Sequence, residues 1–147
     1  MTTPNAPKAT LVDSKIDIKI KLSALWAAIV FFLIYGDYFA LYVPGKLGEM
    51  LASKMGMLGP ITLGTVTQGA LVGASIMLAI PSLLVFLSLV MNASINRWIN
   101  ISFGALYTVI LLVLIQGGWI FLRFYGVVEI ALTLTIVWQA WKWPRTA

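Results

Sequence analysis

Long uncharged apolar runs constrain this chain more than any other feature of its sequence. The longest covers residues 61–91 and contains no charged side chain. A helix that crosses a bilayer needs about 20 such residues. Hydrophobic residues make up 61% of the 147-residue chain and charged residues only 10%, against roughly 45–50% and 25% in soluble domains. The sequence therefore predicts an integral membrane protein.

Four crossings use nearly the whole chain. We predict an all-α four-helix bundle, one transmembrane domain over residues 1–147, with spans at about 22–41, 69–90, 99–115 and 119–138. As a single helix, the run 61–91 would measure about 46 Å and exceed the hydrocarbon core of about 30 Å, so its first part is expected at the membrane surface. Pro81 is expected to kink the second span because its ring removes a helix hydrogen bond.

Residues 44–60, between the first two spans, predict a short amphipathic helix on the outer side. Pro44-Gly45 and Gly59-Pro60 break the chain at its two ends. Apolar side chains recur between these breaks at steps of three and four residues, as Leu47, Met50, Leu51, Met55 and Leu58. Such a helix lies along the membrane surface or caps the bundle. A mobile gating lid is a further interpretation.

The distribution of lysine and arginine predicts the orientation. One side of the membrane receives seven of them, namely Lys8, Lys15, Lys19, Lys21, Arg97, Lys142 and Arg145. The other side receives three, Lys46, Lys54 and Arg123. Because cytoplasmic loops carry the excess of positive charge, both termini, including the segment 1–21, are expected in the cytoplasm. The first apolar run is long enough to span and is expected to be retained and not cleaved as a signal peptide.

The chain contains no cysteine and no histidine. Their absence excludes disulfides, thiol redox chemistry, Cys/His zinc sites, histidine-ligated haem and histidine-dependent triads. No phosphate loop or dinucleotide fingerprint is present, and two intramembrane carboxylates are too few for a metal site. We therefore expect no enzyme, catalytic residue, cofactor or metal. The net charge of +5 lies beside apolar spans, which favours the lipid bilayer over nucleic acid as the partner.

Three ionisable residues, Asp37, Arg123 and Glu129, lie within or close to the predicted spans. A charge at mid-bilayer costs about 2.5–3.5 kcal/mol on insertion scales, so such residues face the bundle interior, water or a partner. Glu129 is expected near the midplane, either as a carboxylate that binds a proton or cation or as a protonated carboxyl hydrogen-bonded to another helix. Asp37 and Arg123 are expected at the same depth and are predicted to pair, clamping the first span to the fourth.

Gln68 and Gln116 would complete a polar cluster in the outer halves of the four spans. With Asp37 and Glu129 they place one polar side chain in the outer half of every span. This pattern predicts either a vestibule with an ion site or interhelical hydrogen bonds, and it leaves the inner half nearly free of intramembrane polarity. Gly69 and Gly73 form a GxxxG pattern, which predicts close helix packing within the chain or with another copy.

Three stretches carry a resemblance to a known family. The chain reads KIKLSALW at residues 19–26, YGDYFALYVPGK at 35–46 and WQAWKWP at 138–144. In these stretches it resembles an uncharacterised family of small bacterial four-span membrane proteins, and the similarity covers most of the chain from Lys19 onward. The resemblance implies a four-span fold in the bacterial inner membrane and brings no activity. Small multidrug-resistance transporters offer an analogy only, since their first helix also carries a carboxylate, whereas Asp37 lies near the outer end of its helix.

Two functional hypotheses follow. The first is a subunit of an oligomeric channel or transporter, in which Glu129 and Asp37 bind a proton or cation. No repeat of 20–50 residues is visible, so a transporter of this size would assemble from several copies. The alternative is a non-transporting scaffold or an accessory subunit of a larger membrane complex. An intramembrane enzyme ranks third because the usual acid–base partners are missing.

Overall fold

A computed structural model describes residues 15–54, 57–58, 61–62 and 64–144. Its elements are α1 (Ile18–Ala40), α2 (Lys46–Leu51), β1 (Met57–Leu58), β2 (Ile61–Thr62), α3 (Gln68–Val90), α4 (Ala93–Leu114) and α5 (Ile120–Trp141). Four of these helices, α1, α3, α4 and α5, are long and apolar enough to cross a membrane. The predicted all-α fold with four spans is confirmed, and the two-residue strands β1 and β2 pair antiparallel in the loop before α3.

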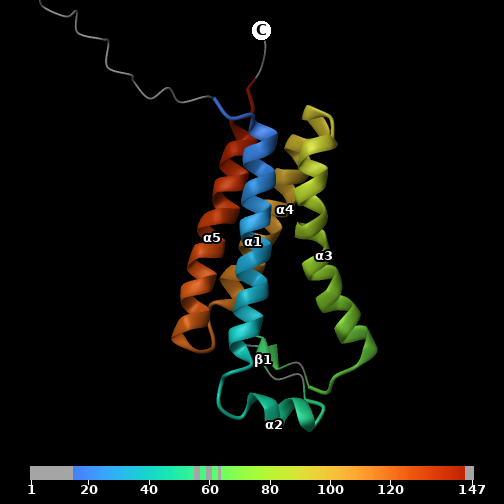
Figure 1. Cartoon of the computed structure of the whole chain (residues 1–147), viewed down its shortest axis with the longest axis vertical. Helices are drawn as coiled ribbons and strands as arrows, with labels where there is room; N and C mark the ends of the chain where they lie inside the picture. Colours follow the sequence, from blue (N-terminus) through green and yellow to red (C-terminus); the bar gives the residue numbers. More distant parts are fainter. Residues whose placement is uncertain (1–14, 55–56, 59–60, 63, 145–147) are drawn as a thin grey trace, which may run out of the picture.

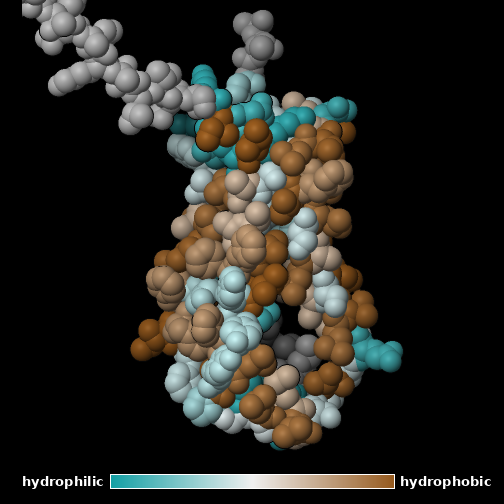
Figure 2. All heavy atoms as spheres, viewed as in Figure 1, coloured by the Kyte–Doolittle hydropathy of each residue, from teal (hydrophilic) through white to brown (hydrophobic). Residues whose placement is uncertain are grey.

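The four long helices stand side by side, and α1 begins at the end of the bundle where α5 finishes (Figure 1). We call this the terminal end. The opposite end carries α2 with β1 and β2, and we call it the loop end. Helix α5 packs against both α4 and α1, and α1 packs against α3, whereas α3 and α4 touch only sparsely. The ring of four helices is therefore closed on three sides. Figure 2 shows hydrophilic residues gathered at the terminal end, next to a mostly apolar surface.

Helix α1 begins at Ile18, earlier than the first apolar run, because polar contacts continue the helix into the basic segment. The Asp17 carboxylate accepts a hydrogen bond from the backbone N–H of Lys19 at 2.7 Å, which caps the first turn. The Lys19 ammonium donates to the carbonyl of Met91 at 2.8 Å, at the carboxyl end of α3, where a positive charge is favoured. Lysine therefore does not end the helix; it joins α1 to α3.

Helix α4 begins at Ala93, and the expected polar turn over residues 92–96 does not form. Only Asn92 lies outside the helix, as its N-cap residue. Asn96 and Asn100 lie inside α4 and are fully buried. Asparagine favours turns only where its amide competes with the backbone, and both of these amides have partners in the bundle, so the helix continues through them.

Helix α2 is shorter than the predicted amphipathic helix. It ends at Leu51, and Leu58 belongs to β1; Met55, Gly59 and Pro60 lie outside the described residues. No residue of α2 is buried, and Leu47, Met50 and Leu51 are all exposed. The interpretation that this helix caps the bundle is therefore wrong, and its position along a membrane surface stays a prediction.

Pro81 lies inside α3, as expected, and the helix bends away from α1 in its first half (Figure 1). A proline has no N–H, so the carbonyl four residues earlier, that of Met77, loses its helical donor. The Tyr107 hydroxyl of α4 donates to this carbonyl at 2.5 Å. In a bilayer, where no water is at hand, such replacement is what allows a proline within a span.

Burial is uneven on the two sides of this contact. We call the part of the bundle between the terminal end and the level of Tyr107 the terminal half, and the remainder the loop half. The terminal half buries large side chains from all four long helices, including Trp26, Leu84, Tyr107 and Ile136. Toward the loop end from Trp26 and Tyr107, α1 buries only Ile29 and Gly36, and α4 buries only Thr108 and Leu111. Helix α3 buries nothing before Pro81.

Candidate functional site

Glu129 is the buried carboxylate of the bundle. Its residue is 5% exposed, and it is the tenth of the 22 residues of α5, close to the middle of the span. It belongs to the buried stripe of this helix, between Gly126 and Thr133. Among the described residues, none forms a hydrogen bond or an ion pair with its carboxylate. A carboxylate in this position is costly unless a proton, a cation or water compensates it.

Asp37 of α1 is the second carboxylate of the site. The ring of Tyr125 lies against Gly36, 3.8 Å from where a β-carbon would stand, so Asp37 lies about one helical turn nearer the loop end than Glu129. Asp37 is itself exposed, whereas Glu129 is buried. Helices α1 and α5 thus place two acidic residues on adjacent levels of the loop half.

Lys46 supplies the nearest counter-charge. This residue, the first of α2, pairs with Glu49 at 3.7 Å. Its ammonium is thus engaged within α2 at the loop end and is not the ion-pair partner of Asp37 or Glu129.

The predicted pair of Asp37 and Arg123 is wrong. Within the parts of the chain that the structure describes, Lys46–Glu49 is the one ion pair, and Arg123 is exposed. Arg123 lies six residues before Glu129, about 120° away around α5, so it lies outside the buried stripe. Similar depth is not sufficient for pairing, because the arginine side chain leaves the bundle instead of crossing to α1.

The two glutamines do not join the site either. Gln68 is the first residue of the bent half of α3 and is exposed. Gln116 is exposed in the turn after α4 and donates to Leu112 of that helix at 3.3 Å. The expected cluster with one polar side chain from every span is therefore reduced to Asp37 and Glu129.

Gly69 and Gly73 are exposed on α3. A β-carbon at Gly73 would meet no atom within 4 Å, so this glycine makes no close helix contact within the chain. Packing against another copy stays a prediction. The close approach occurs instead at Gly104, where a β-carbon would lie 2.8 Å from Cγ2 of Val137 in α5.

The terminal half contains a buried polar network that the sequence analysis does not predict. The Trp26 indole N–H donates to the Asn100 side-chain oxygen at 2.6 Å, and the Asn100 amide donates to the Asn96 side-chain oxygen at 2.6 Å. Asn96 in turn donates to the carbonyl of Ser88 at 2.6 Å. The expectation that this half lacks intramembrane polarity is wrong. The sequence feature that indicates this network is the spacing of Asn96 and Asn100, which places two amides on one helix face.

Helix α3 diverges from the other helices in the loop half. Its first half contributes no buried side chain, and Figure 2 shows the surface hollowed between the lower parts of α1 and α3. Glu129 and Asp37 belong to this half of the bundle, on α5 and α1. A carboxyl group in such a position can hold a proton or a small cation.

Comparison with known proteins gives a family and no activity. A family model described as a family of unknown function (DUF6326) matches residues 11–147. No protein of curated function and no solved structure matches the chain.

Proposed function

We propose that this chain, which belongs to the DUF6326 family of unknown function, is a subunit of a small homo-oligomeric channel or transporter in which Glu129, together with Asp37, binds a proton or a cation. The observation that carries the proposal is Glu129, a residue 5% exposed whose carboxylate has no ion-pair or hydrogen-bond partner among the described residues. A structural carboxylate in a bilayer is normally paired or hydrogen-bonded. The neighbouring helix α1 carries a second acid, Asp37, next to Gly36, which faces Tyr125 one turn before Glu129.

The same half of the bundle supports assembly from several copies. Helix α3 leaves the ring of helices open there, since it buries nothing before Pro81. A continuous path across the bilayer needs walls on all sides, and a second copy supplies the missing one. Lipid bilayer and identical subunits are therefore the proposed partners.

The proposed orientation places both termini in the cytoplasm of a bacterium, with the protein in the inner membrane. Among the described residues, the terminal end carries the larger set of basic side chains, Lys15, Lys19, Lys21, Arg97 and Lys142. The loop end carries Lys46, Lys54 and Arg123; Lys8 and Arg145 lie outside the described residues. The positive-inside bias favours the terminal end as the cytoplasmic one, so the two carboxylates open toward the outer face.

The test is ion flux in proteoliposomes that contain the purified full chain. An internal pH dye reports proton entry under an imposed membrane potential, and exchange of the external cation reports cation flux. We expect Glu129→Gln, which keeps the side-chain shape, to lower the flux by about tenfold or more, equivalent to about 1.4 kcal/mol. Asp37→Asn should lower it less, because Asp37 is exposed at the edge of the site.

Glu49→Gln is the matched control. It removes one negative charge at the loop end from a residue of α2 that is not buried, and it should leave the flux unchanged. Equal flux in wild type and Glu129→Gln, or no flux of any ion, would overturn the proposal in favour of a non-transporting scaffold or accessory subunit.

A further inference from the structure

Arg97 lies beside two tryptophan rings at the terminal end, where α4 packs against α5. It is the fifth residue of α4, about one helical turn inside that end. Its guanidinium carbon lies 5.5 Å from the ring centre of Trp98 in α4 and 5.9 Å from that of Trp141 in α5. At such distances a ring attracts a cation. The two indoles therefore hold the guanidinium at the seam between α4 and α5.

The guanidinium of Arg97 has no anion within the described part of the chain. The one ion pair there joins Lys46 to Glu49, at the loop end. The Nε atom of Arg97 is buried and has no hydrogen-bond partner among the described residues, so no acceptor lies on the inner side of the guanidinium. A charged donor that is left without an acceptor is costly. Because Arg97 is only partly buried, an acceptor from outside the chain can reach it.

The charges of the terminal end favour an acceptor with a net negative charge. The described basic side chains at this end are Lys15, Lys19, Lys21, Arg97 and Lys142. The one described acid there is Asp17, whose carboxylate already caps the first turn of α1. An anionic headgroup is therefore attracted to this end, whereas the ammonium of a zwitterionic headgroup is repelled by the basic residues.

The surface around Arg97 favours an anion that carries acyl chains. Trp98, Trp138 and Trp141 are 57%, 58% and 62% exposed, and Figure 2 shows hydrophilic side chains at the terminal end directly next to apolar ones. Tryptophan rings with this mixed surrounding prefer the headgroup level of a bilayer. A phospholipid covers the exposed rings and brings a phosphate to the guanidinium, whereas a free phosphate ion leaves the rings uncovered.

We propose that Arg97 binds the phosphate of an anionic phospholipid of the phosphatidylglycerol type, with its acyl chains against the indoles of Trp98 and Trp141 at the α4–α5 seam. A planar guanidinium offers pairs of N–H donors that match two phosphate oxygens. Basic pockets between spanning helices bind anionic headgroups in this way. The proposal goes beyond the proposed function and does not depend on it, because lipid binding at Arg97 requires no ion at Glu129.

The experiment is native mass spectrometry of the full chain in detergent, titrated with phosphatidylglycerol or with phosphatidylethanolamine of the same acyl chains. We expect the wild type to retain phosphatidylglycerol more tightly, and Arg97→Gln to weaken its binding about fivefold or more. Arg97→Lys keeps the charge and loses the planar pair of donors, so it should weaken binding roughly two- to threefold. Arg123→Gln is the matched control, since Arg123 is an exposed arginine at the loop end, and it should change nothing.

Three results would overturn the proposal. The first is equal retention of the two lipids by the wild type, and the second is equal weakening by Arg97→Gln and Arg123→Gln. The third is displacement of phosphatidylglycerol by millimolar inorganic phosphate, which would assign the guanidinium to a free anion. If Arg97→Gln does not fold, Arg97→Lys decides, and wild-type affinity in that variant would also overturn the proposal.

Discussion

The two halves of this bundle bury different polar side chains, amides in the terminal half and an acid in the loop half. In the terminal half, Trp26, Asn96 and Asn100 donate and accept within a network of short hydrogen bonds. In the loop half, the buried residue Glu129 has no hydrogen bond from any described residue. A satisfied network stabilises and fixes helix packing, whereas an uncompensated carboxylate is a cost that a function must justify. The difference separates a half whose buried amides join neighbouring helices from a half whose buried acid has no hydrogen-bond partner among the described residues.

The largest effect should come from filling the closest helix contact. A β-carbon at Gly104 would lie 2.8 Å from Cγ2 of Val137 and 3.5 Å from the backbone oxygen of Thr133. The side chain of Gly104→Val must therefore push α4 away from α5, and we expect a loss of about 3 kcal/mol in the free energy of unfolding. Unfolding in bicelles by titration with sodium dodecyl sulfate measures it.

Gly73→Val gives the matched change in the loop half. Because no atom lies within 4 Å of a β-carbon at Gly73, we expect a change within about 0.5 kcal/mol. A large loss at Gly73 would break the comparison, since it would mean that α3 packs tightly against another copy and that the loop half is closed in the assembly. This outcome would also assign a role to the GxxxG pattern.

The network of the terminal half should show the next largest effect. Asn100→Ala removes the acceptor of the Trp26 indole N–H and the donor to Asn96, so we expect a loss of about 2 kcal/mol. Gln116→Ala is the control, because this amide is exposed and bonds only to its own helix; its effect should stay below about 0.5 kcal/mol. Similar losses in both variants would show that the network does not stabilise the terminal half more than an exposed amide does.

The sequence predicted the parts of this fold that depend on length and apolar content. The four spans and the position of Pro81 within α3 follow from the length of each apolar run and from the missing N–H of proline. Glu129 was placed near the middle of its span for the same reason. These features are properties of one segment at a time, and such properties can be read without knowing which helices are neighbours.

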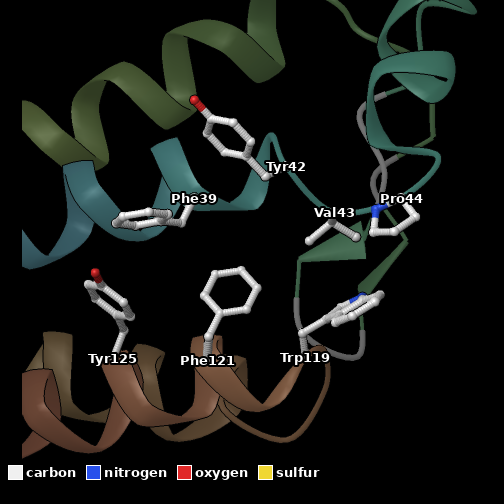
Figure 3. A pocket seen from close by; sticks show the side chains of 7 residues that line it. All are labelled: Phe39, Tyr42, Val43, Pro44, Trp119, Phe121 and Tyr125. Carbon is white, nitrogen blue, oxygen red and sulfur yellow. The ribbon is translucent and has the colours of Figure 1, made fainter.

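The features that depend on neighbouring helices could not be read in this way. The polar sequence around Asn96 predicts a turn. Its burial in α4 depends on Ser88 of α3, which accepts its hydrogen bond and which the local sequence does not reveal. The predicted pair of Arg123 and Asp37 follows from their similar depth in the membrane. Whether the two side chains meet depends on the direction in which Arg123 points around α5. A groove at the loop end between α1 and α5 joins residues about 80 positions apart in sequence, Phe39 and Trp119 among them (Figure 3), and no local pattern predicts it.

The boundary between the two halves provides the finest test. Tyr107→Phe keeps the edge-to-face contact with Trp26, whose ring centre is 5.8 Å away, and removes only the hydroxyl that serves the Met77 carbonyl beside Pro81. We expect a loss of about 1 kcal/mol. In a Pro81→Ala background residue 81 regains its N–H, the carbonyl has a helical donor again, and the same substitution should cost less than about 0.3 kcal/mol. Equal costs in the two backgrounds, measured by the same unfolding titration, would show that Tyr107 does not compensate the proline and that the bend of α3 has another origin.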